Sequence, residues 1–161
     1  MNKPPRRILL LTDVFPCDSY SGALMSGQLC RFLLEIKQQL FCACVRNPAI
    51  KDQTDDYLIN QIPCINFIKP SENTSDDKAE FDEKIEIISQ QIVDYIRDKE
   101  IDTVWCPLQG EALLKIYSFI QKNVKNIKFV TQIWDPFEWV IHDLGYSEDA
   151  KNRFLKYLTS S

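Results

Sequence analysis

The stretch Arg7-Ile8-Leu9-Leu10-Leu11-Thr12-Asp13 decides the fold class. Its four consecutive apolar residues lie between charged or polar ones, a pattern typical of a short strand buried on both faces of a parallel sheet. A loop rich in turn-forming residues follows at 14–21, and apolar side chains recur at helical spacing from Gly22 onward. A buried strand that leads through a loop into a helix is the opening unit of an α/β fold.

Two segments further along have the periodicity of amphipathic helices. The first has apolar residues spaced i, i+4, i+7, i+8 and i+11, at Met25, Leu29, Phe32, Leu33 and Ile36. We expect this row to dock the helix on the sheet. The second has steps of three or four residues, at Phe81, Ile85, Ile88, Ile92 and Ile96. We expect it to be a core stripe, preceded by a capping box at Thr74 and Asp77.

The rest of the chain supplies the other elements of an α/β domain. Short apolar runs predict strands, and one further periodic segment predicts a helix at 111–122; the predicted strands cover 40–45, 64–68, 103–107 and 127–134. The expected order is strand, helix, strand, strand, helix, strand, helix, strand. We predict one Rossmann-like domain over residues 1–161, a three-layer αβα sandwich with a mostly parallel sheet.

Charge and composition exclude several classes of function. The formal net charge is -4 and the pI is near 5.0, so the chain lacks the basic field that nucleic-acid binding needs. Lys3, Arg6 and Arg7 form a dense basic cluster, either a solvated leader or a contact for an anionic lipid or phosphate. No stretch reaches the roughly 20 apolar residues that span a bilayer.

The cysteines favour a reducing compartment. Six are present without any CxxC pair, and the apolar run after the N-terminus is too short for a signal peptide. We therefore expect a cytoplasmic protein with reduced thiols, with peripheral contact at the inner membrane face left open. Cys42 and Cys44 then serve packing. His142 has no cysteine at ligand spacing, so no metal site is expected.

Candidate ligand contacts follow the strand ends, because ligands of open α/β sheets bind beyond the carboxyl ends of the strands. Ser21-Gly22 stands at a helix start, where backbone N–H groups attract anions, although capping explains the same pair. Asp18 lies in the same loop, and Gln109 either contacts a ligand or only begins the next helix. GxGxxG and GxxxxGK[ST] motifs are absent, so no dinucleotide cofactor is expected.

The segment after the last predicted strand gathers aromatic rings and carboxylates. Trp134-Asp135-Pro136 is followed by Phe137-Glu138-Trp139. Trp134, Asp135 and Glu138 suit a hydroxyl-rich sugar, because aromatic faces and carboxylates bind such ligands. A turn set by Asp-Pro with both tryptophans packed beneath it explains the residues equally well.

With these residues in view, the chain resembles the N-terminal domain of GT-B glycosyltransferases, particularly glycosyltransferase family 4. The strongest part is Arg7-Ile-Leu-Leu-Leu-Thr-Asp-Val-Phe-Pro16 followed by Ser21-Gly-Ala-Leu24, which is similar to the first strand, loop and small turn of that family. Asp135-Pro136 is similar to its aspartate-containing segment at the last strand of the domain.

The resemblance implies a retaining transfer of sugar from a nucleotide-sugar donor to a glycan or lipid acceptor. The donor diphosphate is then expected near Ser21-Gly22, and the acceptor at loops of this domain. In that family the nucleotide is held by a second Rossmann-like domain, which this sequence lacks, so we expect the isolated chain to be inactive. The resemblance assigns no catalytic residue here.

Two departures from the family pattern are visible. Ser21 replaces a usual glycine, and its Cβ restricts close approach of a phosphate to the backbone. Lys37-Gln38-Gln39 replaces the usual glycine-containing helix stop.

Residues 137–161 are expected to begin the connection to the missing domain. Phe154, Leu155 and Leu158 in this segment present apolar surface through which the fragment forms homodimers if nothing else covers it. The alternative function is a complete, non-enzymatic, flavodoxin-like module that binds a ligand or a protein.

Overall fold

The computed structural model describes residues 4–17, 21–46, 48, 56–70, 78–108 and 110–133. Within these ranges five strands and four helices follow one another in the order β1(Arg7–Thr12), α1(Ser21–Glu35), β2(Gln39–Arg46), α2(Asp56–Gln61), β3(Cys64–Ile68), α3(Lys78–Asp98), β4(Thr103–Pro107), α4(Gly110–Asn123), β5(Lys128–Gln132). All strands pair in parallel, in the spatial order β3-β2-β1-β4-β5. The predicted α/β, Rossmann-like fold is confirmed.

The first strand occupies the middle of the sheet. β1 pairs with β2 from Arg7↔Gln39 onward and with β4 from Ile8↔Thr103 onward. Because both neighbours flank β1 and helices cover both faces, its apolar run is buried throughout, as expected for a central parallel strand.

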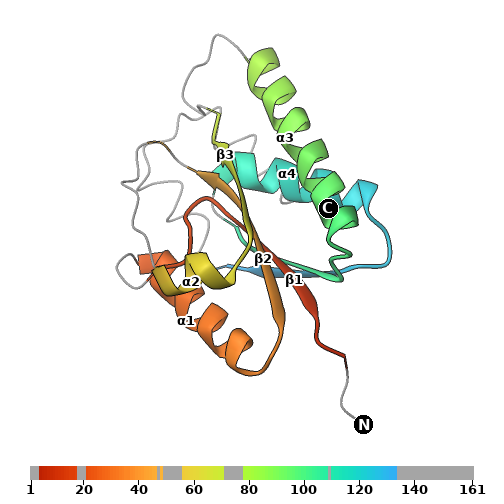
Figure 1. The fold of residues 1–161 in the computed structure, drawn as a ribbon. Helices are drawn as coiled ribbons and strands as arrows, with labels where there is room; N and C mark the ends of the chain where they lie inside the picture. The colour runs from red at the N-terminus through yellow and green to blue at the C-terminus, as the bar shows by residue number, and fades with distance from the viewer. Residues whose placement is uncertain are drawn as a thin grey trace.

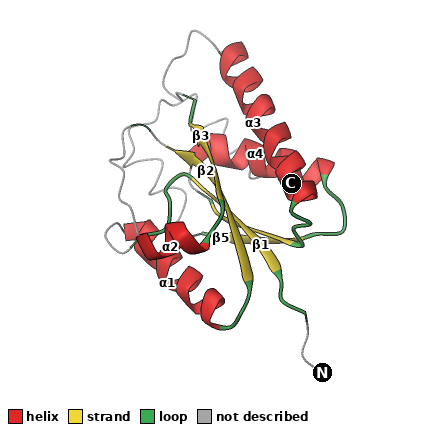
Figure 2. Ribbon diagram, viewed as in Figure 1, coloured by secondary structure: helices red, strands yellow, loops and turns green. Residues whose placement is uncertain are grey.

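Helices cover the sheet on both sides (Figures 1 and 2), α3 and α4 on one face and α1 and α2 on the other. The larger core cluster lies under α3 and α4 and includes Leu9, Leu11, Ile92 and Ile116. The smaller cluster lies on the α1 face and includes Leu10, Cys42 and Trp105. Alternate residues of β1 therefore serve the two cores, as the pleat of a strand requires.

Several predicted elements match the structure closely. The strands 64–68 and 103–107 have the predicted bounds, and the helix at 111–122 begins one residue earlier and ends one later. The predicted core stripe of α3 is confirmed, with Ile85, Ile88, Ile92 and Ile96 buried and Phe81 partly buried against them. Strand 127–134 is shorter than predicted, and the capping residues Thr74 and Asp77 lie outside the described residues.

The prediction of two consecutive strands without a helix between them is wrong. The short helix α2 connects β2 and β3 and buries Leu58, while Ile62 just after it is buried as well. Six residues carry too few apolar positions to show a helical period in the sequence.

The predicted packing face of α1 is also wrong. Met25, Leu29, Phe32 and Ile36 are exposed, and only Leu33 of the predicted row packs partly against the core. The helix instead turns small residues inward, because Ser26, Gly27 and Cys30 are buried. A Cβ on Gly27 would lie 2.9 Å from the carbonyl oxygen of Cys17, so the glycine allows α1 to approach the β1–α1 loop closely.

Residues other than glycine end two helices in the left-handed conformation. Lys37 has φ 61° and Glu100 has φ 48°, at the ends of α1 and α3. At the first of these, the N–H of Gln38 donates to the carbonyl of Leu33 and the N–H of Lys37 to that of Leu34. This is the hydrogen-bond pattern of a Schellman motif. The departure Lys37-Gln38-Gln39 therefore keeps the helix stop that glycine usually makes.

Candidate functional site

The carboxyl end of β1 carries two buried polar residues, Thr12 and Asp13. Thr12 Oγ1 accepts a hydrogen bond from the Val14 N–H at 3.3 Å and lies 2.9 Å from the Val14 carbonyl oxygen, to which it donates. This local turn stops the strand and fixes the start of the loop that leads to α1. A buried carboxylate therefore lies at the sheet edge where ligands of this fold class bind.

The neighbouring strand β4 ends beside this carboxylate. Burial, and secondarily the negative charge of Asp13, raise the pKa of the Cys106 thiol well above its ordinary value. Cys106 is therefore a neutral packing residue at neutral pH, not a nucleophile. The electrostatic influence of Asp13 on Cys106 indicates that the ends of β1 and β4 bring these side chains close together.

A second buried carboxylate lies at the start of α4, directly after β4. Glu111 is buried in the first turn, where the helix dipole favours negative charge. Its Oε1 lies 3.1 Å from Nζ of Lys115, which also forms an ion pair with Asp82 of α3. The Lys115 ammonium stands 4.9 Å from the centroid of the Phe81 ring. This network joins the first turn of α4 to α3.

Hydrogen bonds fix the end of β5 against β4. Trp105 Nε1 donates to Gln132 Oε1 at 2.9 Å, and the N–H of Leu108 donates to the carbonyl of Gln132 at 3.0 Å. Tyr117 of α4 and Thr131 share a hydrogen bond of 2.8 Å between their hydroxyl oxygens. The chain therefore leaves β4 and β5 at the same edge of the sheet, a short distance from Asp13.

The structure tests few of the predicted site residues. Ser21 and Gly22 form the start of α1, but the phosphate contact predicted for them remains a prediction. The other predicted contacts lie outside the described residues: Asp18, Gln109, Trp134, Asp135 and Glu138.

The sequence analysis did not single out Asp13 or Glu111 as ligand contacts. A carboxylate directly after a buried strand is the signal available for Asp13. Glu111 stands four residues before Lys115, a spacing that predicts only a helical ion pair. Together they give the edge two buried carboxylates, groups that accept hydrogen bonds from ligand hydroxyls.

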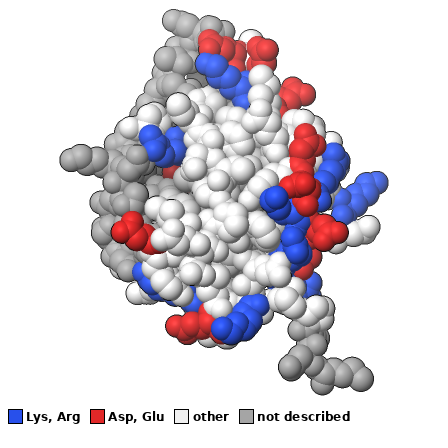
Figure 3. Space-filling model, viewed as in Figure 1, with Lys and Arg blue, Asp and Glu red and all other residues white. Residues whose placement is uncertain are grey.

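Metal and membrane features were searched in the same parts of the chain. No group of three or more metal-ligating side chains occurs among the described residues. None of the described helices is long and apolar enough to cross a membrane. In Figure 3 positive and negative side chains intermingle along the right border, near the end of α3, without a patch of one sign on the face shown.

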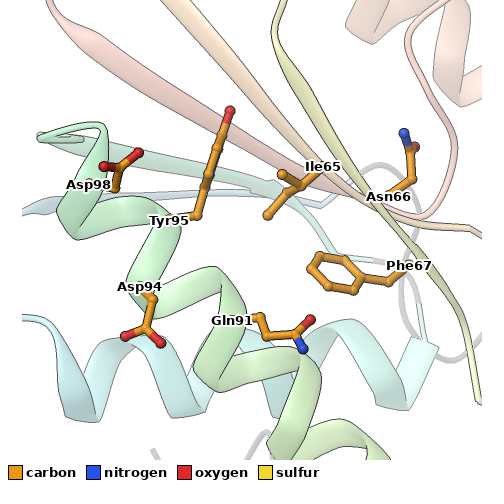
Figure 4. Close-up of a pocket in the computed structure, with 7 residues that line it drawn as sticks. All are labelled: Ile65, Asn66, Phe67, Gln91, Asp94, Tyr95 and Asp98. Carbon is orange, nitrogen blue, oxygen red and sulfur yellow. The ribbon is translucent and has the colours of Figure 1, made fainter.

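A surface groove of about 480 Å³ lies elsewhere, between the edge strand β3 and α3 (Figure 4). Ile65 and Phe67 form its apolar floor, with Tyr95, Asp94 and Asp98 on the helix side. Both carboxylates already have cationic partners, Arg97 at 3.5 Å from Asp94 and Lys99 at 2.8 Å from Asp98. None of the residues lining this groove comes from β1, β4 or β5, so it is separate from the carboxyl edge.

Known proteins resemble this chain in fold but not in sequence. No family model and no curated protein matches it. Two structures of the C-terminal domain of a hydrogenase from Pyrococcus furiosus match with TM-scores of 0.55 and 0.56 at 11% identity, over 81% of this chain and 96% of theirs. A glycosyltransferase from Rickettsia africae matches with a TM-score of 0.52 at 17% identity, over 80% of this chain. The match spans 30% of that glycosyltransferase.

Proposed function

We propose that this chain is the acceptor-side, N-terminal domain of a retaining GT-B glycosyltransferase. In this proposal a second Rossmann-like domain, outside the present sequence, binds the nucleotide of a nucleotide-sugar donor. The donor diphosphate lies near Ser21-Gly22, and an acceptor glycan or lipid binds at the loops beyond β4 and β5. The nucleotide sugar is a substrate, and no further cofactor takes part.

The observation that carries the proposal is the start of α1 at Ser21, after the loop that leaves the central strand. In a sheet of this order, ligand phosphates bind where the first helix points its N–H groups at the carboxyl edge. The buried carboxylates Asp13 and Glu111 at the same edge suit the hydroxyl groups of a sugar. The match to 30% of a glycosyltransferase is the share expected of one domain from a larger enzyme.

The first test concerns the parent protein. We expect the open reading frame to continue past Ser161 with a second Rossmann-like domain of roughly 150 to 200 residues. We also expect the isolated chain to bind uridine or guanosine diphosphate sugars only weakly. Micromolar binding of such donors by the isolated chain in calorimetry contradicts this division of roles.

The second test uses the full-length enzyme with a panel of nucleotide sugars, and release of nucleoside diphosphate as the readout. We expect Asp135→Asn and Glu138→Gln to lower turnover at least tenfold, because both remove a carboxylate from the acceptor side. Asp94→Asn on α3 is the matched control and is expected to leave turnover unchanged. Equal turnover in all three variants would count against acceptor binding at this segment.

The alternative is a non-enzymatic module that binds a ligand or a protein and is complete as it stands. The 96% coverage of the hydrogenase C-terminal domain favours it, because that domain is of similar extent to this chain. The flavodoxin-like form of this alternative does not fit, since that fold has the strand order 2-1-3-4-5 and this sheet has 3-2-1-4-5. A reading frame that stops at Ser161 would support the alternative.

A further inference from the structure

Helix α1 carries a row of large apolar side chains that the described residues leave uncovered. Met25 is 50%, Leu29 36%, Phe32 53% and Ile36 48% exposed, and we call these four residues the α1 stripe. At 100° per residue they fall within about 60° of arc around the helix. Scattered exposed apolar residues are ordinary, whereas a continuous row on one helix marks an interaction surface.

The direction of the α1 stripe follows from two contacts made by other sides of α1. Cys30 is buried in the core between α1 and the sheet, and the Arg31 guanidinium stands 4.8 Å from the centroid of the Tyr57 ring on α2. Helical geometry places the centre of the stripe about 130° from each of these side chains. The stripe therefore faces away from α2, on the flank of α1 nearer to β4 and β5.

The sheet surface on that flank is also open. Trp105 belongs to the core cluster on the α1 face, and Val130 is its in-register neighbour on β5, so both side chains lie on this face. Val130 is partly exposed, as is Ile133 just after β5. The described helices α3 and α4 cover the opposite face (Figure 1). The stripe and β5 thus form an apolar corner without a described helix to fill it.

The size of the stripe argues for an occupant tethered to the domain. Four large side chains that are about half exposed offer roughly 400 Å² of surface. A stable complex between separate proteins buries about 800 Å² on each partner, which the stripe alone does not provide. A segment of the same chain needs less area, because its effective concentration near the site is in the millimolar range.

The chain offers such a segment after β5. Residues 134–161 follow the last described position, and the sequence Ser-Glu-Asp-Ala-Lys-Asn-Arg-Phe-Leu-Lys-Tyr-Leu occupies 147–158. It has a serine at the N-cap position, two acidic residues in the first turn, and an apolar face at Ala150, Phe154, Tyr157 and Leu158. Both this segment and the stripe from Met25 to Ile36 span twelve positions, about 18 Å of helix.

The connection is long enough to reach the stripe. β5 lies two strands from β1, about 10 Å, and a helix packs about 10 Å above a sheet. The 14 residues 134–147 extend up to about 46 Å. We propose that residues 147–158 form a helix that packs antiparallel or parallel to α1, with Phe154 and Leu158 against the α1 stripe. This proposal does not depend on the glycosyltransferase proposal.

A lipid bilayer fits the surface less well. Helices that lie in a membrane interface carry several Lys or Arg residues beside their apolar face. The only basic residue of α1 is Arg31, and it already contacts Tyr57 on the flank opposite the stripe. A bilayer and a second copy of the chain are therefore outcomes for the experiment to reject.

Photo-crosslinking of the full chain distinguishes these occupants. Phe32→benzoyl-phenylalanine keeps an aromatic side chain on the stripe, and the same change at the exposed Ile87 of α3 is the matched control. We expect irradiation of the Phe32 variant to join position 32 to a peptide from 147–158 without a change in molecular mass. Cross-linking at dimer mass, or to phosphatidylglycerol vesicles in place of that peptide, would overturn the proposal. The control is expected to give no link to 147–158.

A double-mutant cycle provides a second measurement. We expect Phe32→Ala and Phe154→Ala each to lower the folding equilibrium constant in urea about tenfold, and the double variant to lower it little further. Ile87→Ala is expected to change the constant less than twofold. A double variant that loses about a hundredfold, as two independent sites would, is incompatible with contact between the segment and the stripe.

Discussion

Lys115→Met tests whether the buried ion pair of α4 holds the start of that helix in place. Only 9% of the Lys115 side chain is exposed, and its ammonium neutralises the buried Glu111 and contacts Asp82. Methionine fills similar volume but leaves the Glu111 carboxylate without its cation. Removing one partner of a buried pair typically costs 3–5 kcal/mol, and the helix dipole at Glu111 reduces this, so we expect a loss of about 3 kcal/mol.

Urea unfolding followed by circular dichroism measures this loss. With a slope of about 2 kcal/mol per molar urea, the midpoint falls by about 1.5 M. Adding Glu111→Gln to Lys115→Met removes the uncompensated charge, and we expect it to restore at least half of the lost stability. Lys84→Met is the matched control, because Lys84 pairs with Glu80 four residues away on the exposed face of α3 and is expected to cost less than about 0.5 kcal/mol.

The pH dependence of the same difference has a definite sign. Burial by itself lowers the pKa of Lys115, but hydrogen bonds and charge from Asp82 and Glu111 outweigh it and raise the pKa above the ordinary value of 10.5. The contribution of Lys115 is therefore fully present below about pH 10.5 and is lost as the pH rises through the folded-state pKa. A stability difference between wild type and Lys115→Met under 1 kcal/mol at pH 7, or a double variant as unstable as Lys115→Met alone, would refute this account.

Three further variants test local features of the fold. Lys37→Gly is expected to stabilise the domain by about 1 kcal/mol in urea unfolding, because glycine adopts φ 61° without the penalty of a Cβ; a loss of stability would contradict this. Gly27→Ala is expected to cost about 1–3 kcal/mol despite the helix preference of alanine, because its Cβ meets the Cys17 backbone; a rise in the thermal midpoint would contradict the close contact. The hydrogen bond from Cys42 lowers the pKa of the half-buried Cys64 below 9.0, so iodoacetamide should alkylate Cys64 with a midpoint below pH 9, and Cys42→Ala should raise that midpoint. An unchanged midpoint in Cys42→Ala would exclude this hydrogen bond as the cause.

The architecture was predictable wherever a single apolar pattern dominated a segment. The run Ile8 to Leu11 has polar neighbours on both sides, and the isoleucines of α3 leave only one way to bury them. Both patterns therefore gave the right element and the right buried residues.

Helix α1 shows why the same method failed elsewhere. Its sequence holds two rows, a large apolar one from Met25 to Ile36 and a smaller one with Ser26, Gly27 and Cys30. Hydrophobicity favours the first, but the structure packs the second on the sheet, because small side chains allow the close approach that Gly27 makes to the Cys17 carbonyl. Backbone distance of this kind is not visible in a hydrophobic period.

The candidate site was predictable in location but not in its charged groups. The rule that ligands bind beyond the strand ends led to the right edge of the sheet. Burial of Asp13 and Glu111 depends on neighbours distant in sequence, such as the contact of Lys115 with Asp82, 33 positions away along the chain. No local pattern carries that information.

The central position of β1 affects the order of events during synthesis. Its first partner, at Gln39, follows about 30 residues later, but its other partner begins only at Thr103. At 5–20 residues per second, the ribosome needs roughly 3 to 13 seconds to make the 64 residues between these two positions. During that time one edge of the most apolar strand in the protein has no neighbour, so the nascent chain is exposed to misassociation and to capture by chaperones until β4 emerges.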